Sequence, residues 1–247
     1  RNVSLHSIIV ILLILELLFF LQGQHDNRIL RKLGVNIWNG NTSREGLDKY
    51  GKQHIQTDDL GLAYGVQWRA AGAELGDIDT NYVGTPGSID QVKNVIELLK
   101  TDPDSRRIII NGWNVPQLKD MALPPCHMLY QFNVTDGKLN CMMTQRSADT
   151  FLGLPFNIAS TAALTCILAK TTDFVPGEII ISLGDAHIYE NHIEQVKTQL
   201  MRTPYQFPTL LIEKELSTIS DVENLSFSDF NLQNYQSHPG IKAKMAV

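Results

Sequence analysis

The sequence predicts a mixed α+β fold in one domain. Short strand-like runs and helical patterns follow one another along the 247 residues, without the regular strand–helix–strand spacing of a parallel α/β sheet. No internal repeat, low-complexity tract or linker-like change in composition divides the chain. Because a chain of this length can bury a large core, we expect one unit with a common interior.

The first element, Ile8 to Leu21, is almost wholly apolar and predicts a buried core helix. It is shorter than the roughly 20 residues that span a bilayer, and Glu16 interrupts it. A membrane or targeting segment is the alternative, but the residues that follow form a poor signal cleavage site. Because an unpaired buried charge is very costly, Glu16 must be hydrogen-bonded or functional.

The next elements follow from turn and capping signals. Residues 40–60 are polar and turn-rich, which indicates an excursion from the core. A helix is predicted to begin at Ser88, which forms a capping box with Gln91. The apolar face of that helix comprises Ile89, Val92, Ile96 and Leu99.

A β-hairpin is predicted in the middle of the chain. Its first strand alternates up to Val134, and the Asp136-Gly137 turn leads into a second strand at Lys138–Arg146. The remaining predicted elements are strands at 106–113 and 177–183, a buried helix at 157–171, and a helix at 187–202 that Pro204 stops.

Composition limits the classes of function. The formal net charge of −5 and the pI of about 5.8 argue against a protein whose main task is to bind nucleic acid. Cys126, Cys141 and Cys166 form neither an even disulfide framework nor a metal-ligand spacing. They suit a reducing compartment, so we expect a cytoplasmic protein.

The strongest chemical signal is the segment Leu123 to His127, in which two prolines precede Cys126. A thiol has a reference pKa of about 8.5 and becomes a good nucleophile when a positive neighbour lowers that value. Arg146, in the later segment Gln145 to Asp149, can do this and also bind a phosphate. The two segments together indicate a nucleophile beside an anion site.

Two further constellations each allow more than one interpretation. Arg106 and Arg107 stand at a turn before an apolar strand. Consecutive strand residues point to opposite faces, so the pair can bind one ligand only from the preceding loop; otherwise they are surface charges or packing residues. His187 and Tyr189 flank one residue and either hold a ligand hydroxyl or form a structural hydrogen bond.

Taken together, these motifs resemble the folate-dependent thymidylate synthases, and the eukaryotic branch in particular. The resemblance runs from about Leu5 to Val247, and its motifs are Asp104–Arg107, Leu123–His127, Gln145–Asp149, Phe151–Ser160 and Gly184–Tyr189. It implies an α+β fold in a single three-layer domain over residues 1–247, with the N-terminal part of the family domain missing. The large mixed β-sheet would pack against its copy in a homodimer.

The resemblance also implies an activity, that of a methyltransferase which converts dUMP to dTMP. The cosubstrate is 5,10-methylenetetrahydrofolate, which leaves as dihydrofolate, and no metal is implied. Cys126 would form a covalent adduct with C6 of the uracil, because C5 alone is a weak nucleophile. The implied catalytic residues are Cys126, Glu16, Tyr64, Asn157 and Arg146, with Asn157 selecting uracil over cytosine.

Binding residues are carried over in the same way. Substrate would be held by Arg106, Arg107, Arg146, Ser147, Asp149, Asn157, His187 and Tyr189, the first two coming from the second subunit. The folate would contact Trp38, Leu123, Asp149, Gly153, Phe156 and Ala246, the last in a C-terminal tail that closes over the site. No membrane is implied, and His127 is interpreted as a network residue.

One departure from the family pattern concerns the first helix. Roughly five extra residues separate Ser7 from Glu16, which turns a helix by about 140°. A bulge, a different helix start or a gene-model error would reconcile the two. The alternative functions are a catalytically impaired paralogue or RNA-binding regulatory protein, and a dUMP or dCMP hydroxymethylase. An upstream fusion to dihydrofolate reductase would only extend the chain.

Overall fold

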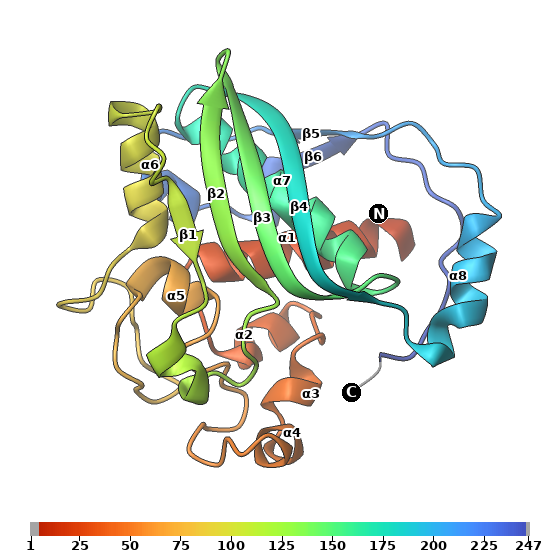
Figure 1. Cartoon of the computed structure of the whole chain (residues 1–247), viewed down its shortest axis with the longest axis horizontal. Coiled ribbons are helices and arrows are strands. Elements are labelled where there is room, and N and C mark those ends of the chain that lie inside the picture. The colour runs from red at the N-terminus through yellow and green to blue at the C-terminus, as the bar shows by residue number, and fades with distance from the viewer. Residues whose placement is uncertain (1–4, 246–247) are drawn as a thin grey trace.

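The computed structural model describes residues 5–245 and forms a mixed α+β fold (Figure 1). Its helices are α1 (Leu5–Leu21), α2 (Asn27–Lys32), α3 (Asn39–Thr42), α4 (Arg44–Lys49), α5 (Gly65–Ala70), α6 (Gln91–Thr101), η1 (Val115–Asp120), α7 (Gly153–Thr171), η2 (Glu190–His192), α8 (Ile193–Leu200), α9 (Ile219–Glu223) and η3 (Phe227–Asp229). Its strands are β1 (Ile109–Asn111), β2 (His127–Thr135), β3 (Lys138–Asp149), β4 (Val175–His187), β5 (Thr209–Ile212) and β6 (Phe230–Gln233).

The main sheet has four strands in the order β1-β2-β3-β4. β1 and β3 both run antiparallel to β2, whereas β3 and β4 are parallel. A parallel pair needs a crossover connection, and α7 provides it by packing on both strands. β5 and β6 form a separate antiparallel pair that contacts α7 through β5. The sheet is therefore mixed, as the sequence predicts.

The central helix of the core is α1, which packs against α5 and α7. Its second half is buried on nearly all sides, including Leu17, Phe19 and Leu21, so the predicted core helix is confirmed. No helix within residues 5–245 is both long and apolar enough to cross a membrane. The helix runs unbroken from Leu5 to Leu21, so a bulge does not absorb the extra residues before Glu16.

The predicted hairpin is confirmed as β2 and β3. Thr135 pairs with Lys138, and the two turn residues, Asp136 and Gly137, have φ values of 52° and 72°. A two-residue turn with two positive φ angles matches the right-handed twist of the flanking strands. The turn sequence therefore sets the register from Thr135 back to Leu129, and a bulge between His127 and Leu129 then shifts it by one residue, so that Cys126 meets Arg146.

The predicted start of α6 is wrong. The N-cap is Asp90, whose carboxylate accepts a hydrogen bond from the Lys93 N–H, and Ser88 instead donates to the carbonyl of Thr85. Ile89 is 55% exposed and lies before the helix. It forms two main-chain hydrogen bonds with Ala71, at 2.8 and 2.9 Å, and this bridge holds it extended.

Other boundaries shift for similar reasons. The strand predicted at 106–113 is confined to Ile109–Asn111, and the helix predicted at 157–171 begins earlier, at Gly153. The predicted helix at 187–202 is shorter, because His187 belongs to β4, where it pairs with Asp149. The regular helix there is Ile193–Leu200.

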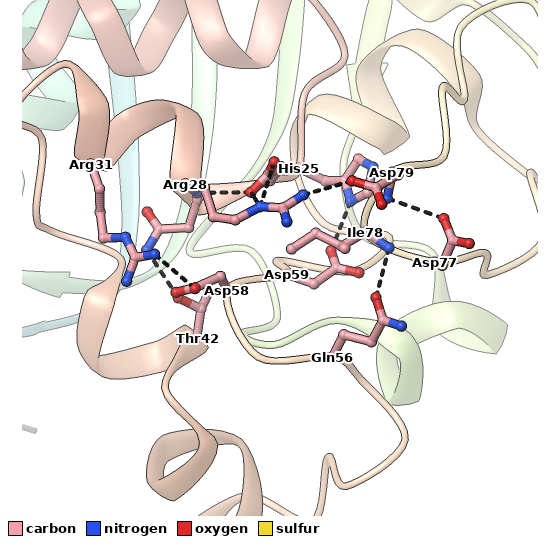
Figure 2. A network of polar contacts seen from close by, with 12 residues as sticks. His25, Arg28, Arg31, Thr42, Gln56, Asp58, Asp59, Asp77, Ile78 and Asp79 are labelled. Carbon is pink, nitrogen blue, oxygen red and sulfur yellow. Dashed lines mark hydrogen bonds and ion pairs between the residues drawn. The ribbon is translucent and has the colours of Figure 1, made fainter.

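The chain after α1 is fixed by a polar network (Figure 2). His25 lies 2.7 Å from Asp59 and 2.9 Å from the carbonyl of Thr80, both through ring nitrogens. Nearby, Arg28 bridges Asp26 and Asp79. These contacts tie the end of α1 to two loops, and the excursion predicted at 40–60 is thereby held against the core.

Candidate active site

Cys126 lies immediately before β2, and Arg146 holds it in place. The Nε of Arg146 donates to the carbonyl of Pro125 at 3.0 Å, and Nη2 donates to that of Pro124 at 2.8 Å. The main-chain N–H of Arg146 also donates to the carbonyl of Cys126 at 2.9 Å. This contact follows from the hairpin register, in which Gln145 pairs with His127. The predicted proximity of the two segments is therefore confirmed.

The thiol of Cys126 lies 3.9 Å from Nη2 of Arg146. Burial raises the pKa of Cys126, whereas the charge of Arg146 and a hydrogen bond from Tyr64 act in the opposite direction. The net shift is upward. Arg146 therefore lowers the pKa of the thiol, as predicted, but the desolvation of the thiolate outweighs the attraction of the guanidinium.

Tyr64 contacts the main chain of Cys126. Its hydroxyl oxygen accepts a hydrogen bond from the Cys126 N–H at 2.9 Å, and its ring stacks on Phe20 with centroids 4.8 Å apart. Tyr64 has φ 31° and ψ −91°, a conformation that costs a non-glycine residue about 1–3 kcal/mol. Burial raises its pKa well above the usual value, so the phenol stays protonated. The surrounding packing holds this strained residue against the main chain of Cys126.

Glu16 has a hydrogen-bond partner, as its position in an apolar helix predicts. The indole N–H of Trp38 donates to Glu16 Oε1 at 2.8 Å. Burial raises the pKa of Glu16 to about 7, and the hydrogen bond from Trp38 only partly opposes that shift. The Trp38 ring also meets the edge of Tyr64, with centroids 5.5 Å apart. Glu16 therefore sits next to the cysteine cluster with the acidity that a general acid or base needs near neutral pH.

Asn157, in the first turns of α7, is oriented by a residue that sequence reasoning missed. Gln145 is buried, and its Nε2 donates to Asn157 Oδ1 at 3.0 Å and to the carbonyl of Ser147 at 2.9 Å. Gln145 Oε1 is buried without a partner among the described residues. The only sequence signal was a polar residue at an inward position of an alternating strand.

The Asp149 carboxylate lies at the start of α7. Its Oδ1 accepts the N–H groups of Phe151 and Leu152 at 3.1 and 3.2 Å. A side chain at Gly153 would come within 3.5 Å of Asp149 Cβ, so the glycine keeps the space beside the carboxylate open. Phe156, one turn further on, packs against the main core, as does Leu123 beside the cysteine.

His187 and Tyr189 lie at the same end of the sheet. Asp149 pairs with His187, and Ser147 pairs with Asp185. The rings of His187 and Tyr189 meet edge to face, with centroids 4.9 Å apart. The parallel register therefore gathers residues from β3 and β4 that are almost forty positions apart in the chain.

Two predicted groups are not brought to the cysteine. Arg106 and Arg107 are exposed and precede Ile108, whose carbonyl accepts from Phe132 at 2.9 Å. Phe132 is six residues beyond Cys126, which is about 20 Å along an extended strand. Ala246 lies outside the described residues. Within residues 5–245, no group of three His, Cys, Asp or Glu side chains is placed to hold a metal ion.

Comparison with known proteins identifies the family of this chain. The family model described as thymidylate synthase matches residues 3–247. A bifunctional dihydrofolate reductase-thymidylate synthase of Paramecium tetraurelia is 51% identical over 94% of this chain, and the chain spans about half of that relative, 49%. The thymidylate synthase of Herpesvirus ateles is 48% identical, with 94% of the chain and 78% of the relative covered.

A third relative is the thymidylate synthase of Saccharomyces cerevisiae. It is 47% identical over 244 residues, which covers 95% of this chain and 79% of the relative. The match extends from the first helix through the cysteine loop to the end of the chain, so it includes every segment from which the site is built. The chain therefore belongs to the thymidylate synthase family.

Proposed function

We propose that this protein is a thymidylate synthase that reductively methylates dUMP to dTMP. The cosubstrate is 5,10-methylenetetrahydrofolate, which supplies the one-carbon unit and a hydride and leaves as dihydrofolate. The main support for the proposal is the contact between the Cys126 thiol and Arg146 in a chain of this family. The Tyr64 hydroxyl also accepts a hydrogen bond from the Cys126 N–H. A nucleophile, a cation and a phenol in contact suit covalent attack on an electron-poor ring.

In the first step, the Cys126 sulfur forms a bond to C6 of the uracil. The thiol proton is lost, and the ring electrons move through C5 to O4 as an enolate. C5 of the enolate then attacks the methylene carbon of the cosubstrate, and the bond from that carbon to one of its two folate nitrogens breaks, with the electron pair and a proton going to the nitrogen. Arg146 supports this step twice, since its charge favours the thiolate and its hydrogen bonds to two proline carbonyls fix the loop.

We assign proton movement around O4 and the cofactor nitrogens to waters that Glu16 organises, and assistance to the loss of the C5 proton, through water, to Tyr64. After methylene transfer, C5 must lose its proton so that the folate can leave and an exocyclic methylene can form. The raised pKa of Glu16, about 7, makes both of its protonation states available near neutral pH. Trp38 links this carboxylate to the aromatic cluster around the cysteine.

Recognition of the nucleotide rests on Asn157, Arg146 and the end of the sheet. An amide offers a donor to O4 of uracil and an acceptor to N3–H, the pattern that uracil requires. Gln145 holds this amide in place. We assign Arg146 and Ser147 to the phosphate, and His187 and Tyr189 to the deoxyribose hydroxyl, because the strand register gathers them at one end.

The folate is assigned to the neighbouring residues. Asp149 would bind the pterin, and Gly153 leaves room beside it. Trp38, Leu123 and Phe156 provide apolar surface, and Ala246 belongs to the tail that would cover the ligands. Hydride transfer from the reduced folate to the exocyclic methylene then forms the methyl group. The Cys126–C6 bond breaks as the C5–C6 double bond re-forms, which releases dTMP, the free thiolate and dihydrofolate.

We infer further that two copies share their active sites, with each three-layer subunit placing its sheet against the other. Alternate residues of β3 and β4, among them Met142 and Ile180, are 44% and 56% exposed and point away from α7. Arg106 and Arg107 are too far from their own cysteine to reach its substrate, which suits a role in the second subunit's site. Mixing Cys126→Ser subunits with Arg106→Ala subunits should create one intact site per mixed dimer and restore activity.

The proposed function is tested by the absorbance of dihydrofolate as it forms from dUMP and 5,10-methylenetetrahydrofolate. Formation of dihydrofolate and dTMP in equal amounts is the expected result. A hydroxymethylated nucleotide without dihydrofolate would indicate the hydroxymethylase, in which water attacks the exocyclic methylene. No turnover by a protein whose thermal unfolding is cooperative would overturn the proposal.

A further inference from the structure

His192 is a fully buried histidine that the proposed chemistry does not use. It ends η2, and its side chain is 0% exposed. The rings of Phe151 and Tyr189 enclose it, with centroids 5.4 and 5.7 Å away. A buried imidazole needs a partner at each ring nitrogen, so its two contacts indicate its role.

The Nε2 of His192 faces the C-terminal segment. It lies 2.7 Å from the main-chain carbonyl oxygen of Lys244, and the same oxygen accepts from Asn191 Nδ2 at 3.2 Å. A carbonyl oxygen can only accept, so Nε2 must carry a proton. Two donors from adjacent residues therefore hold one carbonyl of the tail.

The Nδ1 of His192 faces Asp149. It is buried, has no hydrogen-bond partner among the described residues, and lies 3.8 Å from Asp149 Oδ1. This separation is about 1 Å longer than a direct hydrogen bond. The same carboxylate oxygen already accepts the N–H groups of Phe151 and Leu152. A small movement of the ring or of the carboxylate thus decides whether the two groups bond.

We propose that His192 is a positioning residue that couples the seating of the C-terminal segment to the orientation of the Asp149 carboxylate. The inference rests on the proposed function, which assigns Asp149 to the pterin of the cosubstrate. With the Lys244 carbonyl bound at Nε2, the ring plane is fixed and Nδ1 is directed at Asp149. When the segment leaves, the ring loses that restraint and the carboxylate loses its neighbour.

Such coupling is reciprocal. If the seated segment strengthens cosubstrate binding by some factor, the bound cosubstrate strengthens seating of the segment by the same factor. Coupling of this kind typically amounts to between about fivefold and 150-fold. Neither nitrogen of His192 faces Cys126, Asn157 or Arg146 in the described contacts, and towards the nucleotide site the ring packs against Tyr189, a contact that an aromatic replacement keeps. The inference therefore predicts an effect on the folate and not on dUMP.

The experiment measures, by titration calorimetry, the binding of dUMP to the full chain and then of dihydrofolate to the dUMP complex. His192→Phe fills the same space without either nitrogen. It should weaken dihydrofolate binding about tenfold and leave dUMP binding within about twofold. His192→Gln keeps a donor for the Lys244 carbonyl but has no group at the Nδ1 position, and should show the same split. If the His192→Phe variant fails to fold, the His192→Gln variant alone tests the inference.

A double-mutant cycle separates coupling from a merely structural role. Removal of residues 244–247 should weaken dihydrofolate binding in the wild type, and should weaken it by a smaller factor in the His192→Phe or His192→Gln background. Both changes break one link, whereas the loss of the tail's own ligand contacts is common to all backgrounds. Additive losses, or an equal loss of dUMP binding, would overturn the inference. If the wild-type chain bound dUMP and turned over, yet the His192 variants bound dihydrofolate normally, the inference alone would fail.

A matched control uses another histidine that contacts a main-chain carbonyl. His238 Nε2 lies 2.8 Å from the carbonyl of Thr203. His238→Phe should leave both binding constants and the effect of the truncation unchanged. If the wild type neither binds dihydrofolate nor forms it from dUMP, the proposed function fails first, and this inference fails with it.

Discussion

Two buried histidines of this molecule each face an aspartate, but only one of them has both nitrogens satisfied. His25 bonds Asp59 at 2.7 Å and the Thr80 carbonyl at 2.9 Å. Both partners accept at these atoms, so the ring carries both protons and is a cation. His192 bonds the Lys244 carbonyl at 2.7 Å but stays 3.8 Å from its aspartate. His25, bonded at both nitrogens, fixes loops to the core, whereas His192, bonded at one nitrogen among the described contacts, adjoins the ligand site.

The same contrast separates two acidic side chains. Asp59 Oδ1 has two partners, the ring of His25 and the Gly61 N–H, within the network of Figure 2. Glu16 accepts its one described hydrogen bond from a neutral donor, Trp38, and its pKa rises to about 7. A carboxylate that is left short of partners remains free to exchange protons, which is what catalysis needs.

The largest expected effect is the loss of turnover when the catalytic cysteine is replaced and the structural network around His25 is left intact. Cys126→Ser replaces the nucleophile with a group of similar size, so turnover should fall by roughly 10⁴-fold or more. The His25 network and the core should be unaffected, and the melting temperature should stay within a few degrees. Dihydrofolate formation and thermal unfolding measure the two quantities. Turnover near the wild-type rate would remove Cys126 from the mechanism.

Glu16→Gln should lower turnover by about 10²- to 10⁴-fold, because it removes a group that exchanges protons. The inflection near pH 7 in the wild-type profile should disappear with it. The folded-state pKa of Glu16 lies above its unfolded value of 4.5, so the stability that protonated Glu16 contributes is lost as pH rises from there through about 7.

Stability therefore provides a second test of Glu16. Above pH 7, Glu16→Gln should be more stable than the wild type, by up to about 3 kcal/mol, because the amide removes a desolvated charge. Denaturant unfolding at pH 5 and pH 8 measures the difference. Equal stabilities at pH 8, together with an unchanged pH profile of turnover, would contradict the assigned pKa.

The opposite pattern is expected at His25. His25→Gln leaves Asp59 buried without its cation, and should cost about 3–5 kcal/mol of unfolding free energy with kcat nearly unchanged. Burial works to lower the pKa of His25, but the hydrogen bond and charge of Asp59 outweigh it, and the pKa is raised above 6.5. The stabilisation should thus be complete below pH 6.5 and decline as pH rises through the folded-state pKa.

A control for His25 exists on the surface. His54 lies 3.1 Å from Asp120, with its side chain 45% exposed, so His54→Gln should cost less than about 1 kcal/mol. Denaturant titrations of both variants between pH 5 and 8 make the comparison. Equal losses at the two positions, or no pH dependence in the wild type, would show that the buried pair does not stabilise the fold.

The smallest expected effect concerns the hydrogen bond from Trp38 and the pKa of Glu16. Trp38→Phe removes the hydrogen bond that lowers the pKa of this carboxyl, so its pKa should rise further above 7. The inflection in the pH profile of turnover should move to higher pH, by up to about one unit. A shift to lower pH would show that Trp38 acts on Glu16 in some other way.

Sequence patterns predicted the features that depend on neighbours along the chain. The Asp136-Gly137 turn predicted the hairpin and so brought Arg146 near Cys126, although the bulge near His127 that sets their final register was not predicted. The buried position of Glu16 correctly implied a partner, although not that the partner would be Trp38. These inferences needed only local geometry and the cost of burying a charge.

Features that depend on distant segments were not predicted. Ile89 bonds Ala71 and so delays the start of α6, and the pairing of Asp149 with His187 extends β4 into a predicted helix. The upward shift in the pKa of Cys126 arises from burial by the whole fold. The role of His192 could not be predicted from the sequence pattern, because its bonding partner is a carbonyl 52 residues away.

The parallel pairing of β3 and β4 also implies an order of folding. β2 and β3 can zip from their two-residue turn, a local event on the microsecond scale. β4 pairs with β3 only across a long connection that contains α7, so its pairing carries a larger loop-closure entropy and is expected later. Since His187 lies at the far end of β4, a refolding chain should recover its hairpin early and its nucleotide site last.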